Sequence, residues 1–245
     1  QAPVGNEIQT KPENAAANEP EPQDTEVNSE VDEILIQAKQ LVESNPAKVI
    51  QAREMLGNTL DMSISEKQRK RIKETLGQFA DDWLFSTNAY PQDPLTDTYT
   101  VQPGDLLMDI GRQHKVPYEI LMEINHILRA EHLRAGQTIK VINGPFHVRV
   151  DCSDYRLDLY LRNTFIKSFK VGLGKAGMET PTGLWMVEVG GKLIKPRWTD
   201  PISGKTYEPT DPDYPLGSRW IGLKGIEGDA KGRQGFAIHG TKDPE

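Results

Sequence analysis

The first structured part of the chain carries apolar residues at three- and four-residue steps, the spacing of one buried helix face. A first helix is marked by Ile34, Ala38, Leu41 and Val42. A second follows Pro46, which suits a first helical turn capped by Ser44 or Asn45, and carries Val49, Ala52, Arg53 and Leu56. A third starts near Ser65 and carries Leu76, Phe79, Ala80, Trp83 and Leu84. The pattern predicts a small α-helical unit at residues 31–86, interpreted as a spacer or docking bundle that folds independently.

The next apolar pattern predicts a strand, two helices and a strand over residues 98–142. The opening strand, Thr98 to Val101, leads into the turn Gln102-Pro103-Gly104-Asp105, where Asp105 is a plausible N-cap. Pro117 stands in the first turn of the second helix, and Thr138 to Val141 form the closing strand. Residues 87–97 contain Pro91 and Pro94 and are expected to form an extended linker.

From Phe146 onward apolar and polar residues alternate with the period of half-buried strands. Val148, Val150 and Cys152 alternate with Arg149 and Asp151, so we expect Cys152 to face the core and to be chemically inert. A second strand carries Leu157, Leu159 and Leu161, and a third ends near Val171. A long loop at 195–218 with five prolines is expected to shape a site rather than a core.

Charge and composition separate the N-terminus from the rest. Residues 1–30 are rich in Gln, Asn, Pro, Glu and Ala, which predicts a disordered linker. Residues 1–33 carry a net charge of −8, against −7 for the whole chain, so the remainder is nearly neutral and nucleic acid is not an expected partner. Because the chain opens with Gln1, we expect an export signal, and a possible membrane anchor, upstream of residue 1.

The residues that bind metals or form disulfides are few. A single cysteine excludes an intramolecular disulfide, and the five histidines show no metal-ligand spacing. We therefore expect neither a metal site nor a cofactor.

Residues 98–142 resemble a LysM domain, through the turn at Gly104-Asp105, the two helix patterns, Asn125 and the closing strand. The resemblance implies a β-α-α-β module that binds N-acetylglucosamine-containing glycan, as in peptidoglycan, in a groove between two loops. The positions that fall in those loops are Gly104, Asp105, Leu106, Asn125, Ile127 and Leu128. For each of them a role as turn-former, cap or core residue is the alternative. Leu106 departs from the family, where serine or threonine usually follows the aspartate.

Residues 146–245 resemble the L,D-transpeptidase (YkuD-type) catalytic domain. Three segments carry the resemblance, namely Thr180-Pro181-Thr182-Gly183, Arg219-Trp220-Ile221-Gly222-Leu223 and Phe236-Ala237-Ile238-His239-Gly240-Thr241. It implies a mainly-β domain in which a cysteine thiolate transfers an acyl group between peptidoglycan stem peptides. By the same resemblance His239 is the general base, with Gly240 beside it, and Arg219 and Trp220 bind substrate. The implied location is outside the cytoplasm, in the periplasm or cell wall.

In the family, an S-x-G-C-[IV]-R segment follows the H-G motif shortly, whereas this sequence stops at Pro244-Glu245. We therefore expect a multidomain protein whose transpeptidase-type domain is incomplete here, with its catalytic cysteine beyond residue 245 and no activity in the chain as given. The alternative is a non-catalytic peptidoglycan-binding or scaffold protein with a silent transpeptidase-like domain.

Overall fold

The computed structural model describes residues 28–175 and 177–242 and divides after Val171 into two compact units. Most of the expected linker at 1–30 lies outside the described residues. Its last three residues belong to the first helix and its cap, because the Asn28 side chain accepts a hydrogen bond from the Glu30 amide. The two units are described in turn.

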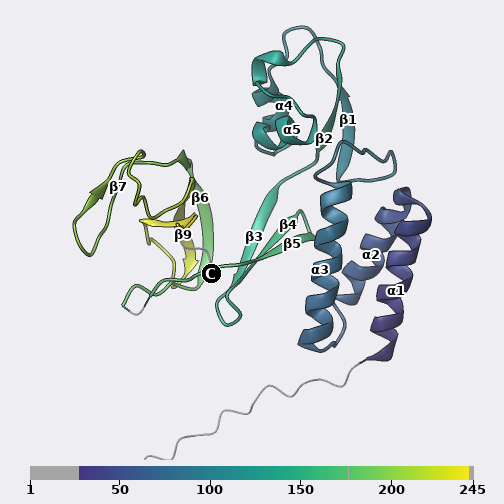
Figure 1. Ribbon diagram of the computed structural model, residues 1–245, viewed down its shortest axis with the longest axis horizontal. Helices are drawn as coiled ribbons and strands as arrows, with labels where there is room; N and C mark the ends of the chain where they lie inside the picture. Colours follow the sequence, from purple (N-terminus) through teal and green to yellow (C-terminus); the bar gives the residue numbers. More distant parts are fainter. Residues whose placement is uncertain (1–27, 176, 243–245) are drawn as a thin grey trace, which may run out of the picture. The chain divides into compact units, whose positions relative to one another are not determined.

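The first unit opens with three α-helices, α1 (Ser29–Ser44), α2 (Val49–Thr59) and α3 (Glu66–Trp83), which lie side by side in Figure 1. A 3₁₀ turn, η1 (Pro46–Lys48), precedes α2, and Asn45 caps it. Ser65 and Gln68 form a reciprocal capping box at the start of α3. The helices predicted from apolar spacing are therefore present, and their starts are set by local side-chain bonds.

A β-α-α-β arrangement follows. It comprises β1 (Thr96–Thr100), α4 (Leu107–Gln113), α5 (Tyr118–Ile124), the short 3₁₀ turn η2 (Ala130–His132) and β2 (Thr138–Ile142). β1 and β2 pair antiparallel, with Thr98 opposite Lys140. A Cβ on Gly111 would lie 2.9 Å from the Val116 carbonyl oxygen, so glycine allows α4 to approach the start of α5 closely.

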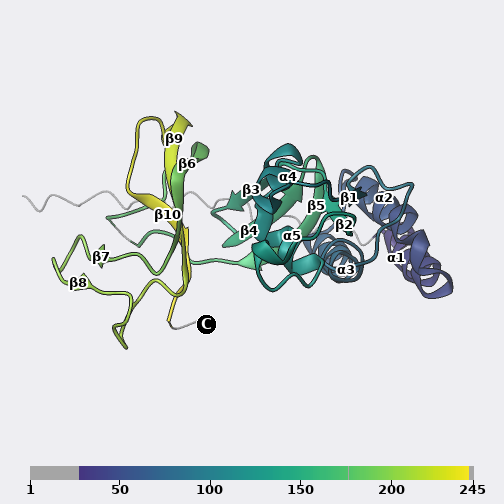
Figure 2. The ribbon, with the colours of Figure 1, turned by 90° about the horizontal axis from the view of Figure 1, so that it is seen from above.

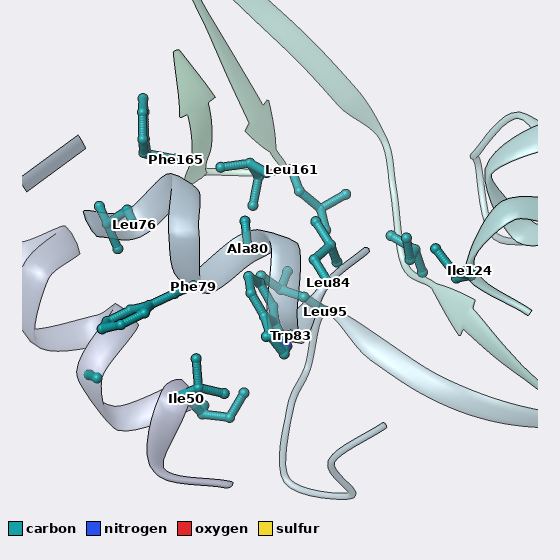
Figure 3. Packing of buried hydrophobic residues seen from close by; sticks show 14 of the residues in the cluster. Ile50, Leu76, Phe79, Ala80, Trp83, Leu84, Leu95, Ile124, Leu161 and Phe165 are labelled. Atoms are coloured by element: carbon teal, nitrogen blue, oxygen red, sulfur yellow. The ribbon is translucent and has the colours of Figure 1, made fainter. Parts of the chain in front are cut away.

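The rest of the first unit is a three-stranded antiparallel sheet of β3 (Phe146–Asp151), β4 (Arg156–Leu161) and β5 (Thr164–Lys170). α3 packs against β5. Ala80 and Leu84 point toward Leu161, and Trp83 lies beside Leu95 (Figure 3). The helices, the β-α-α-β module and this sheet therefore share one hydrophobic core, and the prediction that the helical unit folds independently is wrong.

Residues 87–97 are not simply an extended linker. Asp93 and Leu95 are buried, and Thr96 is already part of β1. Asp93 takes hydrogen bonds from Arg53 Nη1 at 2.9 Å and Thr96 Oγ1 at 3.0 Å. Pro91 and Pro94 predicted an extended linker, but nothing in the sequence indicated that the carboxylate of Asp93 would be buried in the core.

The expected inward orientation of Cys152 is also wrong, because its side chain is exposed. β3 ends at Asp151, whose carboxylate accepts hydrogen bonds from the Ser153 amide and hydroxyl. These bonds lower the pKa of Asp151, with the Ser153 hydroxyl contributing most. Cys152 belongs to the turn that follows the strand, and Val148 and Val150, with which it was expected to point inward, are themselves 40% and 36% exposed.

The second unit contains a three-stranded antiparallel sheet in the order β10-β9-β6, with β6 at Gly183–Ile194, β9 at Arg219–Gly228 and β10 at Phe236–His239 (Figure 2). A two-stranded hairpin, β7 (Trp198–Thr199) and β8 (Thr206–Tyr207), lies within the long loop. Gly183 leaves no room for a Cβ, which would lie 2.0 Å from the Glu227 carbonyl oxygen at a φ of +136°. The glycine that ends Thr180–Gly183 is therefore required where β6 meets the end of β9.

Candidate functional site

His239 is the last residue of β10 and lies directly opposite Trp220 of β9. The two rings stack, with centroids 5.7 Å apart and planes 10° from parallel. His239 Nδ1 lies 2.7 Å from the Gly240 carbonyl oxygen, an acceptor, so Nδ1 carries the proton in this contact. The neutral ring then keeps the lone pair on Nε2, and the side chain is exposed. This is the tautomer that a general base needs at Nε2.

The row of residues continues across the sheet. Leu193 of β6 lies opposite Trp220 on its other side, so Leu193, Trp220 and His239 share one face. Two residues further along β9, a Cβ on Gly222 would lie 2.9 Å from Glu188 Oε2 and 3.4 Å from Trp220 Nε1. The absence of a side chain at Gly222 therefore makes the space that the indole and this carboxylate occupy.

Gly240 is held against the end of the long loop. A Cβ on Gly217 would lie 2.8 Å from the Gly240 Cα, and Gly217 has a φ of +63°. The Gly240 amide donates to the Arg219 carbonyl at 3.4 Å. The backbone beside His239 is thus fixed by close glycine contacts. Arg219 itself is exposed, and one guanidinium nitrogen donates to the Ser218 carbonyl at 3.1 Å.

The loop at 195–218 is ordered by its own contacts. Tyr214 is buried and donates its hydroxyl to the Pro196 carbonyl, and burial raises its pKa. Trp198 and Tyr207 stack across the β7-β8 hairpin, and Arg197 pairs with Glu208 at 3.0 Å. The loop therefore presents a defined hairpin next to the start of β9 in the chain.

In the β-α-α-β module, Asp105 is not the helix N-cap that the sequence predicts. Leu106 occupies the cap position, without a side-chain bond. The Asp105 carboxylate instead accepts hydrogen bonds from the Tyr99 hydroxyl at 2.8 Å and the Gln102 amide at 2.7 Å. The bond to Asp105 raises the pKa of Tyr99. Gly104 has a φ of +91°, so Gly104 and Asp105 both shape the turn.

Asn125 joins the second helix to the closing strand. Its amide nitrogen donates to the carbonyls of Leu121 and Lys140, each at 2.8 Å, and its oxygen accepts from the Lys140 amide at 2.7 Å. Ile127 is buried in the core. These contacts give both residues a structural role, the alternative left open by the sequence.

Exposed apolar side chains remain in this module at Leu106 (59%) and Leu128 (85%), both predicted from the sequence as glycan contacts. Met108 is 51% exposed and was not among the predicted residues. The exposure of Met108 could have been predicted from the sequence, because Met108 lies off the helix face that Leu107, Ile110 and Gly111 bury.

Within residues 28–175 and 177–242, no group of three or more His, Cys, Asp or Glu side chains could hold a metal ion. In the same part of the chain, no helix combines the length and apolar character that a membrane span needs.

Comparison with known protein families assigns both modules. Residues 99–141 match the LysM domain, and residues 145–245 match the L,D-transpeptidase catalytic domain (YkuD). The resemblances inferred from the two sets of motifs are thereby confirmed.

Curated relatives include a Bacillus subtilis protein named L,D-transpeptidase YkuD, 29% identical over 154 residues, or 60% of this chain and 77% of the relative. A Bacillus licheniformis protein of the same name is 25% identical over 60% of this chain and 76% of its own length. L,D-transpeptidase YqjB of Bacillus subtilis is 36% identical over 42% of this chain and 53% of its own length. A crystal structure of a MoCVNH3 variant in complex with (N-GlcNAc)4 aligns at 26% identity over 31% of this chain and 54% of its own, with a TM-score of 0.21.

Proposed function

We propose that this chain, which carries a LysM domain followed by an L,D-transpeptidase (YkuD) catalytic domain, belongs to an enzyme that transfers acyl groups between peptidoglycan stem peptides. The observation that carries the proposal is the state of His239. Its Nδ1 proton is held by the Gly240 carbonyl, its ring is stacked on Trp220, and Nε2 is left free to accept a proton.

In the proposed reaction, the catalytic cysteine that the family places after its H-G motif gives its thiol proton to His239 Nε2. The sulfur attacks the carbonyl after the third residue of a donor stem, so a C–S bond forms. The C–N bond to the terminal D-alanine then breaks, and the leaving amine takes up the proton. An acceptor amine attacks the thioester in turn and restores the thiol.

Trp220 and Arg219 are proposed to position the imidazole and the substrate rather than to take part in making or breaking bonds. Trp220 fixes the plane of the imidazole, and Arg219 keeps guanidinium donors that a stem carboxylate could accept, since only one of its nitrogens is used by Ser218. Backbone amides near the cysteine are proposed to hold the tetrahedral oxyanion.

The LysM module is proposed to hold the enzyme on glycan. Leu106, Met108 and Leu128 offer exposed apolar contact, which suits the faces of an uncharged sugar better than ion pairs do. Binding there raises the concentration of stem peptides near the catalytic domain. The proposed location is therefore outside the cytoplasm, in the periplasm or cell wall.

Mass spectrometry after treatment with a carbapenem, which mimics the donor carbonyl, tests the catalytic proposal. The chain extended by its natural downstream residues should form a covalent adduct on the downstream cysteine. His239→Ala should slow this acylation by about 10²–10⁴-fold, whereas His132→Ala, an exposed histidine of η2, should not. An adduct on Cys152, or an unchanged rate in His239→Ala, contradicts the assignment.

The same experiment separates the enzyme from a non-catalytic scaffold. If the extended chain binds peptidoglycan but forms no adduct and turns over no donor stem, the scaffold function holds and the enzyme proposal fails.

A further inference from the structure

A groove of about 1330 Å³ lies in the first unit, between α2 and α3 on one side and the β3-β4-β5 sheet on the other. None of the residues proposed for glycan binding or acyl transfer lines it. Its lining contains eight Lys or Arg residues and eight Asp or Glu residues. This balance disfavours a polyanion and suits a ligand that carries both signs of charge.

Asp158 of β4 is the central feature of the groove. Its side chain is only 10% exposed, and its Oδ2 accepts a hydrogen bond from Lys73 Nζ of α3 at 2.6 Å. Its second oxygen, Oδ1, is buried and has no partner within the described part of the chain. A buried carboxylate oxygen without a donor is costly, so a donor from outside the chain would stabilise Asp158 at this position.

A second unpartnered atom lies next to it. Ser168 of β5 is directly opposite Asp158, and its Oγ is also buried without a partner among the residues that the structure describes. Because cross-strand partners point to the same side of a sheet, the two atoms can receive one ligand group. An ammonium offers three N–H donors and satisfies both oxygens.

A positive charge that could bind the carboxylate of such a ligand lies on the neighbouring strand, β3. Arg149 of β3 lies directly opposite Asp158, so Arg149, Asp158 and Ser168 form one row across the sheet. Arg149 is exposed, its guanidinium carbon lies 5.7 Å from the Tyr160 ring centroid, and no carboxylate pairs with it within residues 28–175 and 177–242. Its planar donors are free to take a carboxylate in a bidentate contact.

We propose that this row is a binding site for a short peptide that carries both a free ammonium and a free carboxylate. The ammonium lies at Asp158 Oδ1 and Ser168 Oγ, and the carboxylate lies at Arg149. This identification rests on the proposed function: the peptide is a peptidoglycan stem, and its diamino acid supplies both the ammonium and the carboxylate. The site is distinct from His239 and holds the stem without reacting with it.

Titration of the full 245-residue chain with the tripeptide L-Ala-γ-D-Glu-meso-diaminopimelate, followed by calorimetry and amide shifts, tests this site. We expect saturable binding with shifts in β3, β4 and β5. Acetylation of the diaminopimelate side-chain amine should weaken binding about tenfold or more, because Asp158 loses its charged donor. The peptide contains no sugar, so the LysM module does not contribute.

Two variants locate the site. Arg149→Gln and Ser168→Ala should each weaken binding, the first about tenfold or more, without a change in thermal unfolding. Arg134→Gln removes an exposed arginine outside the groove and should leave binding unchanged. Absence of saturable binding, or equal affinity in wild type and Arg149→Gln, overturns the proposal.

His239→Ala distinguishes this proposal from the acyl-transfer one. Tripeptide binding that persists in His239→Ala and weakens in Arg149→Gln places the ligand in the groove, whatever the outcome with carbapenem. Binding that disappears in His239→Ala but survives in Arg149→Gln assigns the peptide to the His239 site and rejects the groove.

Discussion

The carboxylate of Asp93 accepts a hydrogen bond from the indole N–H of Trp83 at 2.6 Å, in the core between the helices and the LysM domain. Its other oxygen pairs with Arg53, whose guanidinium lies 4.5 Å from the Trp83 ring centroid. The side chains of Arg53 and Asp93 are 5% and 0% exposed. A buried charge pair of this kind depends on both partners.

Replacing Asp93 with alanine should therefore lower the free energy of unfolding by about 3–5 kcal/mol, since Arg53 would keep a buried charge without its counter-ion. Urea denaturation measures the loss. Asp97→Ala removes an exposed carboxylate four residues away and should change stability little. Equal effects of the two substitutions would show that burial of the pair is unimportant.

Lys140 gives the stability a pH dependence. Its ammonium donates to the carbonyls of Leu84 at 3.2 Å and Ser86 at 3.0 Å, beyond the end of α3, as well as to that of Trp83. Burial lowers its pKa to about 8, against a smaller opposing pull from Asp93. Between pH 8 and the unfolded value near 10.5 the unfolded chain binds more protons, so this residue's contribution to stability rises with pH.

The measurement compares urea denaturation of wild type and Lys140→Met from pH 7 to 9.5. The difference between them isolates Lys140, because the raised pKa values of Tyr99 and Tyr214 act in the opposite direction in both proteins. The stability of wild type relative to the variant should increase above pH 8. A difference that stays flat or falls contradicts the predicted titration.

Leu128→Ser should weaken binding of chitotetraose while leaving unfolding nearly unchanged, because Leu128 is exposed and contributes little to the core. Amide shifts during titration of the chain report the affinity. Ile36→Ser on α1 is the matched control, an exposed apolar residue outside the LysM domain. Unaltered affinity in Leu128→Ser would remove this residue from the glycan surface.

Gly222→Ala tests the space beside Trp220. The added methyl would meet Glu188 Oε2 and the indole, so we expect Trp220 and the stacked His239 to shift and carbapenem acylation of the extended chain to slow by up to about 10²-fold. Gly172→Ala, where an added Cβ meets nothing within 4 Å, should acylate at the wild-type rate. A normal rate in Gly222→Ala would show that the spacing is not needed.

The sequence predicted those features that depend on neighbouring residues. Ser65 and Gln68 lie three residues apart, so the start of α3 can be read locally, and the alternation at Leu157, Leu159 and Leu161 belongs to β4. The family motifs indicated His239 in the same way, while its stacking on Trp220 needed the pairing of β9 with β10.

What the sequence could not predict depends on residues far apart in the chain. Asp93 becomes a buried ligand of Arg53 only because residues 40 positions apart meet in the core. Asn125 was a glycan candidate until its bonds to Lys140 were visible, and Asp158 gave no signal because its partner Lys73 is 85 positions away. The prediction for Cys152 failed because the alternating residues of β3 do not form a buried face, since Val148 and Val150 are exposed as well, and the strand ends at Asp151.

The bonds from Lys140 to the end of α3, and the packing of α3 on β5, leave no flexible joint between the LysM domain and the first strands of the transpeptidase domain. A glycan strand held by the LysM domain would therefore fix the height and direction of these strands above the wall. A LysM module on a loose tether would instead leave β3, β4 and β5 free to turn relative to the bound glycan.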